Sequence, residues 1–169
     1  MALTYTLISS SVLSSNTASV TFNSIPSTYT DLVIKMSVRG NAGAYSSGYS
    51  LGFNGGAGGA SWTYRRLYGY DSTAGSDTGY GSIPYFITGT ATTADTFSNE
   101  EIYISNYLSS TNKSFDGSHT AENNSTTNWS VSETANLWSN TTAISSLSVV
   151  SSGNFVSGSS FYLYGIKSS

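Results

Sequence analysis

The single histidine of the chain, His119, limits the acid–base chemistry that the sequence can offer. A general base for a serine nucleophile, or an imidazole metal ligand, must be this residue. Asp116 and Ser118 lie beside it, but side chains alternate between the two faces of a strand, so sequence neighbours rarely meet at one reacting atom. We therefore interpret His119 as a polar residue on an exposed strand.

A second catalytic pattern, Gly48-Tyr49-Ser50-Leu51-Gly52, has the G-x-S-x-G spacing of a hydrolase nucleophile elbow. That motif works where a strand turns sharply into a helix, and here Phe53-Asn54-Gly55-Gly56 follows instead. A hydrolase that uses Ser50 with His119 is therefore the least favoured of three functional hypotheses, and the other two, given below, are not catalytic. The leading expectation is that the chain is not an enzyme and has no catalytic residues.

Metal and cofactor sites are also poorly supported by the residue patterns. Glu100 and Glu101 are adjacent and would face opposite sides of a strand. Asp71 and Asp77 lie in a predicted loop without the D-x-D-x-D-G pattern of a calcium site. The glycine run 55–61 lacks the Gly-Lys-Ser/Thr ending of a phosphate-binding loop, and the chain has no cysteine. The sequence predicts no metal ligands and no cofactor.

The aromatic residues are the remaining candidates for a functional surface. Tyrosine and tryptophan combine a large apolar face with a polar group, which suits both stacking on sugar rings and packing between subunits. Either use is open to six residues: Trp62, Tyr64, Tyr68, Tyr70, Trp129 and Trp138.

The elements that must position these residues are strands. Charged residues make up only 9% of the chain and aromatic residues 14%, and β-branched and aromatic side chains occupy the apolar positions. We predict about eight to ten strands and little or no helix. The strand-like runs from which these strands are drawn are 3–10, 18–22, 31–39, 49–54, 61–68, 83–88, 100–107, 113–122, 129–138, 144–150 and 161–166. The run 49–54 lies inside a glycine-rich region at 40–59, and a second long loop is predicted at 69–81.

One strand, Asp31 to Arg39, is the most apolar and is expected at the centre of a sheet. Leu32 and Ile34 would face the core, with Lys35 and Arg39 on the polar face. Short strands without helices predict an antiparallel two-sheet β-sandwich of jelly-roll type, with a closed barrel as the alternative. Residues 1–169 fit a single domain.

Charge and hydropathy narrow the choice of partners. Six Lys plus Arg residues and a formal net charge of −3 are too few positive charges for a nucleic-acid interface. No apolar run is long enough to cross a bilayer, and the start Met1 to Leu7 lacks the features of a signal peptide. We expect no nucleic-acid or membrane partner, and synthesis in a cytoplasm.

Four segments resemble a set of small virion proteins of tailed bacteriophages, particularly phages of cyanobacteria. These segments are Ser24 to Leu32, the Phe53-Asn54-Gly55 turn, Ile102 to Tyr107 and Gly158 to Ile166. The resemblance implies a β-sandwich on the capsid surface of the virion. It implies a decoration (cement) protein that stabilises the head by binding the major capsid protein, usually as a homotrimer. The alternative is a fibre, receptor-binding or carbohydrate-binding module.

Overall fold

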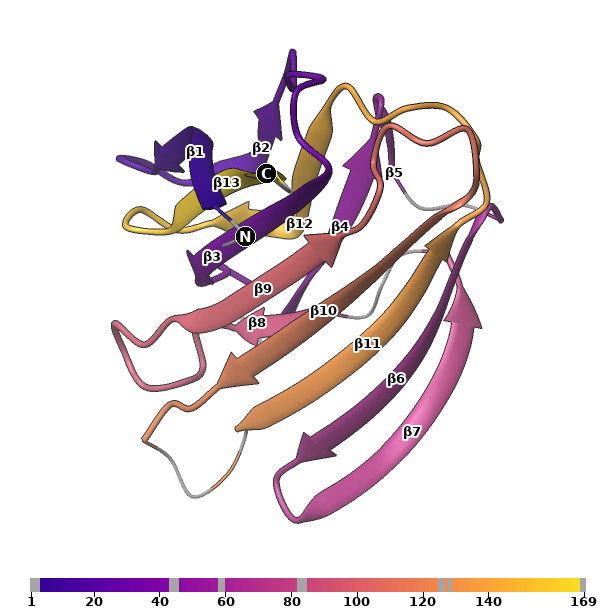
Figure 1. The fold of residues 1–169 in the computed structure, drawn as a ribbon. Helices are drawn as coiled ribbons and strands as arrows, with labels where there is room; N and C mark the ends of the chain where they lie inside the picture. The colour runs from indigo at the N-terminus through magenta and orange to yellow at the C-terminus, as the bar shows by residue number, and fades with distance from the viewer. Residues whose placement is uncertain are drawn as a thin grey trace.

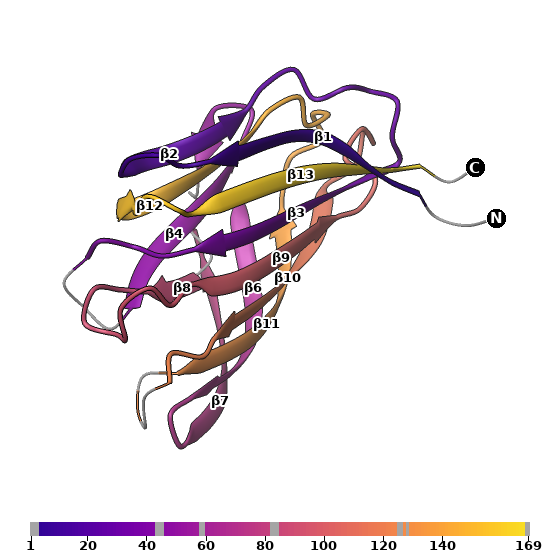
Figure 2. The ribbon, with the colours of Figure 1, turned by 90° about the vertical axis from the view of Figure 1, so that its left-hand side faces the viewer.

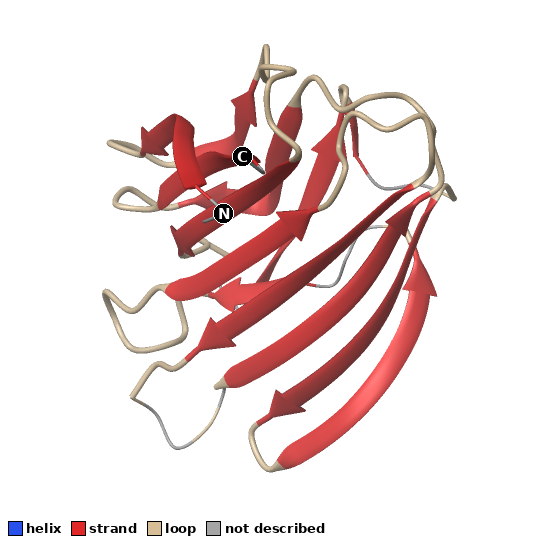
Figure 3. Ribbon diagram, in the orientation of Figure 1, coloured by secondary structure: helices blue, strands red, loops and turns tan. Residues whose placement is uncertain are grey.

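The protein is all-β in the computed structural model, which describes residues 4–42, 46–57, 60–81, 85–124, 127 and 129–167. The described residues contain no helix (Figure 3), and therefore none that could cross a membrane. They form thirteen strands: β1 Thr4–Val12, β2 Thr17–Phe22, β3 Asp31–Val38, β4 Ser46–Phe53, β5 Gly56–Ala57, β6 Trp62–Tyr70, β7 Thr73–Tyr80, β8 Tyr85–Thr88, β9 Ser98–Ile104, β10 Lys113–Ala121, β11 Ser130–Trp138, β12 Leu147–Phe155 and β13 Ser160–Lys167.

Two antiparallel sheets confirm the predicted sandwich. Four neighbouring strands of the larger sheet run in the order β1-β13-β3-β9, and the smaller sheet contains β2-β12-β4 with β8 paired to β4. Eight strands in these two orders are the arrangement of a jelly roll, in which successive strands cross between the sheets. We call these eight strands the jelly-roll half.

Two insertions enlarge one of the sheets. The first insertion, β5 to β7, lies between β4 and β8, and the second, β10 and β11, lies between β9 and β12. They meet because β11 pairs with β6, which extends the larger sheet to the order β9-β10-β11-β6-β7. We call β10, β11, β6 and β7 the wing. It curves away from the jelly-roll half (Figures 1 and 2).

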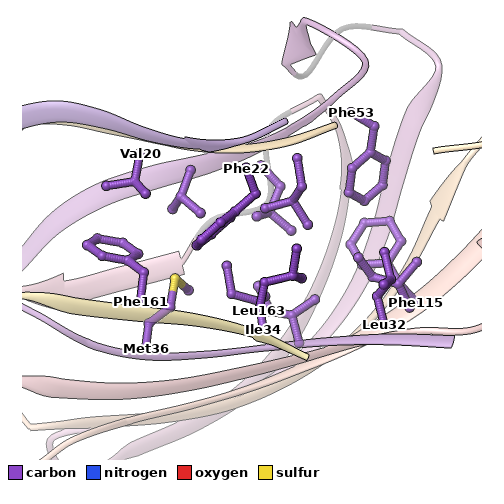
Figure 4. Packing of buried hydrophobic residues seen from close by; sticks show 14 of the residues in the cluster. Val20, Phe22, Leu32, Ile34, Met36, Phe53, Phe115, Phe161 and Leu163 are labelled. Atoms are coloured by element: carbon purple, nitrogen blue, oxygen red, sulfur yellow. The ribbon is translucent and has the colours of Figure 1, made fainter. Parts of the chain in front are cut away.

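The apolar core fills the space between the two sheets of the jelly-roll half. Leu32, Ile34 and Leu163 on the larger sheet are each 0% exposed, and Phe22 and Leu51 cover them from the smaller sheet. Figure 4 shows Phe22 of the smaller sheet facing Ile34 and Leu163 of the larger sheet. The alternating pattern of β3 therefore places its apolar residues as expected, and β3 lies between β13 and β9 inside the sheet.

Two details of the expected fold are wrong. Arg39 is 7% exposed rather than on a solvent face, because its guanidinium donates to the carbonyl oxygens of Thr93 (2.9 Å) and Thr96 (2.8 Å). The segment 69–81 is not a long loop: β6 and β7 form a hairpin whose turn includes Asp71 at a φ of 50°. Its small and polar residues fit an edge strand, for which an apolar pattern is not required.

Candidate ligand-binding pocket on the wing

The inner face of the wing is polar around His119, although its other end carries the core residues Trp62, Phe115 and Trp138. Alternation along β10 and β11 turns His119, Ser132, Thr134 and Asn136 inward, where they are 2 to 6% exposed. Thr134 and Asn136 form hydrogen bonds within this face, as Asn136 Nδ2 donates to Thr134 Oγ1 at 2.9 Å. Burial of so many polar groups is costly unless they are paired or serve a ligand.

A chain of hydrogen bonds crosses this face and links four residues. His119 Nδ1 lies 2.6 Å from Glu100 Oε1, and His119 Nε2 lies 2.7 Å from Ser130 Oγ. The Tyr49 hydroxyl, from the smaller sheet, donates to Glu100 Oε2 at 3.0 Å. Glu100, His119 and Ser130 come from the adjacent strands β9, β10 and β11, so the sheet itself fixes their spacing.

Glu100 is a deeply buried ionisable group. Its side chain is 0% exposed, and burial raises the pKa of its carboxyl, while the charge and hydrogen bond of His119 and the hydrogen bond of Tyr49 oppose that rise. A buried, ionised carboxyl without such partners would strongly destabilise the folded protein. Tyr49 and His119 therefore account for how the fold tolerates Glu100.

Arg66 on β6 supplies a positive charge beside the same face. Its guanidinium contacts Asp77 on β7 through two hydrogen bonds, of 3.1 Å from Nε and 2.5 Å from the terminal nitrogen. The guanidinium carbon also lies 4.7 Å from the ring centre of Tyr68 and 5.5 Å from that of Phe86. The carboxylate and the two rings hold the guanidinium in place.

These groups surround a pocket of about 400 Å³ at the open end of the wing. Tyr68, Tyr70 and Phe86 provide aromatic walls, and His119, Ser130 and Ser132 provide polar groups, with Arg66 between the two sets. Phe86 belongs to β8 of the smaller sheet, so the pocket lies where that sheet ends and the wing continues uncovered. The arrangement combines flat apolar surfaces with fixed hydrogen-bonding groups.

The structure corrects the interpretation of His119. Its side chain is buried, not exposed, and it bonds to residues distant in sequence rather than to Asp116 or Ser118. Glu100 and Glu101 do face opposite sides, since Glu100 is buried and Glu101 pairs with Lys35 at 2.7 Å on the outer face.

The other sequence patterns do not form sites in the described residues. Ser50 lies within β4 and not at a strand end that turns into a helix. The Asp77 carboxylate accepts hydrogen bonds from Arg66. No group of three potential metal-ligating carboxylates or imidazoles occurs in the part of the chain that the structure describes. The glycine run includes β5, and its residues 58–59 lie outside the described residues.

The six aromatic candidates separate into two groups. Tyr68 and Tyr70 line the pocket, Tyr64 lies beside Gly79 on β7, and Trp129 lies beside Gly69. Trp62 and Trp138 are 3% and 6% exposed because they pack against Phe53, at ring-centre distances of 4.9 and 5.3 Å. These two tryptophans are core residues.

Several residues of the pocket, among them Arg66, Phe86 and Ser130, were not predicted from the sequence. Arg66 and Phe86 have no distinctive pattern around them, and Ser130 is one of many serines. Glu100, however, shares its strand face with Ile102 and Ile104, which are both 0% exposed. A carboxylate in register with two core isoleucines is a signal that a buried partner is required.

Comparison with known proteins adds no family to this geometry. No protein-family model matches the chain, and no curated protein matches it.

Proposed function

We propose that this protein is a surface component of a phage particle that binds a saccharide in the wing pocket. The observation that carries the proposal is the pocket itself, in which Tyr68 and Phe86 supply aromatic surface beside Ser130, Ser132 and His119. Sugars have apolar ring faces and a periphery of hydroxyl groups, and this combination matches both sets of residues. The volume falls within the roughly 300–1,000 Å³ of small-molecule sites.

The charge of the pocket favours a neutral sugar. Arg66 is the cation that lines it, and Asp77 already balances that charge through two hydrogen bonds. A saccharide carboxylate would have to compete with Asp77 for the same guanidinium. Neutral hexoses and their short oligomers are therefore the expected ligand class.

A glycan array followed by calorimetry with the strongest neutral ligand tests this proposal. We expect Tyr68→Ala and Phe86→Ala each to weaken binding by about tenfold or more, as the loss of one aromatic contact of roughly 1.4 kcal/mol would. Tyr80→Ala is the matched control, because Tyr80 is 80% exposed on β7 and does not line the pocket. Absence of neutral ligands on the array, or equal binding by all variants, would contradict the proposal.

A capsid decoration role is the second candidate, and the open edge at β1 favours it. β1 pairs with β13 on one side and has no second strand neighbour among the described residues. Tyr5, Leu7 and Val12 along it are 49, 50 and 63% exposed. Exposed apolar side chains on an unpaired edge strand favour association with another chain. The proposed partners are the major capsid protein and further copies of this chain, as a homotrimer.

Particles prepared without this protein test the decoration role. The purified chain should attach to them, and Leu7→Glu should prevent attachment because it places a charge on the proposed contact edge. Leu67→Glu on the wing, where Leu67 is 65% exposed, is the matched control. Light scattering with size-exclusion chromatography reports whether the free protein is a trimer. Failure of the unaltered chain to attach would reject this role, irrespective of saccharide binding.

A further inference from the structure

The hydrogen-bond chain from Tyr49 to Ser130 has a sequence of donors and acceptors that ligand binding alone does not require. The Tyr49 hydroxyl and His119 Nδ1 both contact Glu100, one on each carboxylate oxygen. When Glu100 is ionised it can only accept, so the imidazole must donate from Nδ1. That tautomer leaves a lone pair on Nε2, which lies 2.7 Å from Ser130 Oγ and can accept the hydroxyl proton.

This order is the one that activates a serine for nucleophilic attack. A buried acid orients an imidazole, and the imidazole removes the serine proton as the oxygen attacks a carbonyl carbon. The three side chains come from separate strands of one sheet, and both hydrogen bonds are within the usual range for such a site. His119 and Glu100 are 2% and 3% exposed, so their geometry is protected from water.

Ser130 also meets the requirement that a nucleophile be accessible. It is only partly buried, and it lines the 400 Å³ pocket together with His119. The Arg66 guanidinium, held by Asp77, lines another part of the same pocket. A buried network with a purely structural role would not need to end at a pocket.

We propose that Ser130 is a nucleophile that cleaves carboxylic esters, with His119 as its general base. Ser130 Oγ forms a bond to the ester carbonyl carbon, and its proton passes to His119 Nε2. The bond from that carbon to the alcohol oxygen then breaks, and the alcohol leaves with the proton. Water, deprotonated by His119, attacks the acyl-serine, releases the carboxylic acid and restores Ser130. The net reaction is ester plus water to acid plus alcohol.

A fluorophosphonate probe tests this proposal without any saccharide, so the result is independent of the proposed binding function. The probe forms a covalent bond with activated serines only. We expect one adduct per chain, located on Ser130 by peptide mass spectrometry, and none in Ser130→Ala. Ser114→Ala is the matched control, because Ser114 is an exposed serine on the outer face of β10.

Hydrolysis of the ester p-nitrophenyl acetate measures the rate of the complete catalytic cycle. His119→Gln should slow both labelling and hydrolysis by about 100-fold or more, the usual contribution of a general base. Ser130→Ala alters a partly exposed hydroxyl and should fold even where the histidine variant does not, which circular dichroism will report. Unlabelled Ser130 in the unaltered chain, or hydrolysis that persists in Ser130→Ala, would overturn the proposal.

Discussion

The jelly-roll half and the wing share one sheet, but their inner faces differ in chemistry. Leu32, Ile34 and Leu163 in the jelly-roll half lie beneath a second sheet and are completely buried. In the wing the same face carries Arg66 and His119, and the smaller sheet ends at β8 beside it. A sheet extended beyond its covering layer gains a concave surface that no core residue needs to fill. The difference separates a region that stabilises the fold from one that is available to a ligand.

Replacing a large apolar side chain by alanine should give the largest difference in free energy of unfolding between the two regions. Phe161 is 0% exposed and contacts Phe155 at a ring-centre distance of 5.0 Å, so Phe161→Ala should lower the free energy of unfolding by about 3–5 kcal/mol. Leu67→Ala on the outer face of the wing should change it by less than about 0.5 kcal/mol. Urea unfolding followed by circular dichroism measures both. Similar losses would mean that the exposed Leu67 stabilises the fold as much as a core residue does.

His119→Ala should have the next largest effect, because it removes the partner of a buried carboxyl. We expect a loss of about 3 kcal/mol, at the lower end for a broken buried pair, since Glu100 can take up a proton once its pKa is raised. The double variant His119→Ala with Glu100→Gln should be more stable than His119→Ala alone. If the two substitutions add independently, the pair does not interact as described.

Two glycines next to tyrosine rings distinguish the regions more finely. A methyl group at Gly165 would lie 2.2 Å from Tyr29 Cγ, whereas one at Gly75 would lie 2.8 Å from the Tyr68 hydroxyl at the end of its side chain. Gly165→Ala should therefore destabilise the fold by about 1–3 kcal/mol. Gly75→Ala should cost less than about 1 kcal/mol but displace a ring of the pocket and weaken saccharide binding. Unchanged binding in a folded Gly75→Ala protein would argue against the role of Tyr68.

Asp116 on the outer face of the wing should have the smallest effect, and it depends on pH. Partial burial, with the nearby Glu101 charge, raises the pKa of Asp116 above its ordinary value. The folded state therefore holds the proton to a higher pH than the unfolded state, and stability falls as pH rises through the raised pKa. Asp116→Asn should melt slightly higher than the unaltered protein at pH 7 and equally near pH 3. An Asn variant that melts lower at pH 7 would reverse the assigned sign.

Alternation of apolar residues was sufficient to predict the sandwich and the central position of β3. The same rule failed for β7, since Thr73 to Tyr80 contains few apolar residues and is held by backbone pairing with β6. It also failed for Arg39, whose burial depends on carbonyl groups more than fifty residues away. A local pattern of residues does not predict contacts between residues so far apart in the sequence.

The candidate site was less predictable than the fold. Tyr68 and Tyr70 were identified as aromatic candidates, but Trp62 and Trp138 belong to the core, and composition alone cannot separate these cases. The Glu100, His119 and Ser130 contacts depend on the order of β9, β10 and β11 and on the register between them. The pairing of β11 with β6, which places Arg66 and Tyr68 near His119, joins two separate insertions and has no local signature.

The most direct test of whether the wing is the functional region is a titration with the most tightly bound neutral saccharide, followed by nuclear magnetic resonance. We predict that changes in amide chemical shift concentrate on β6, β10 and β11 around Tyr68 and Ser132, while the shifts of β1 and β13 remain unchanged. Shifts concentrated along the β1 edge, or none with any neutral saccharide, would contradict it.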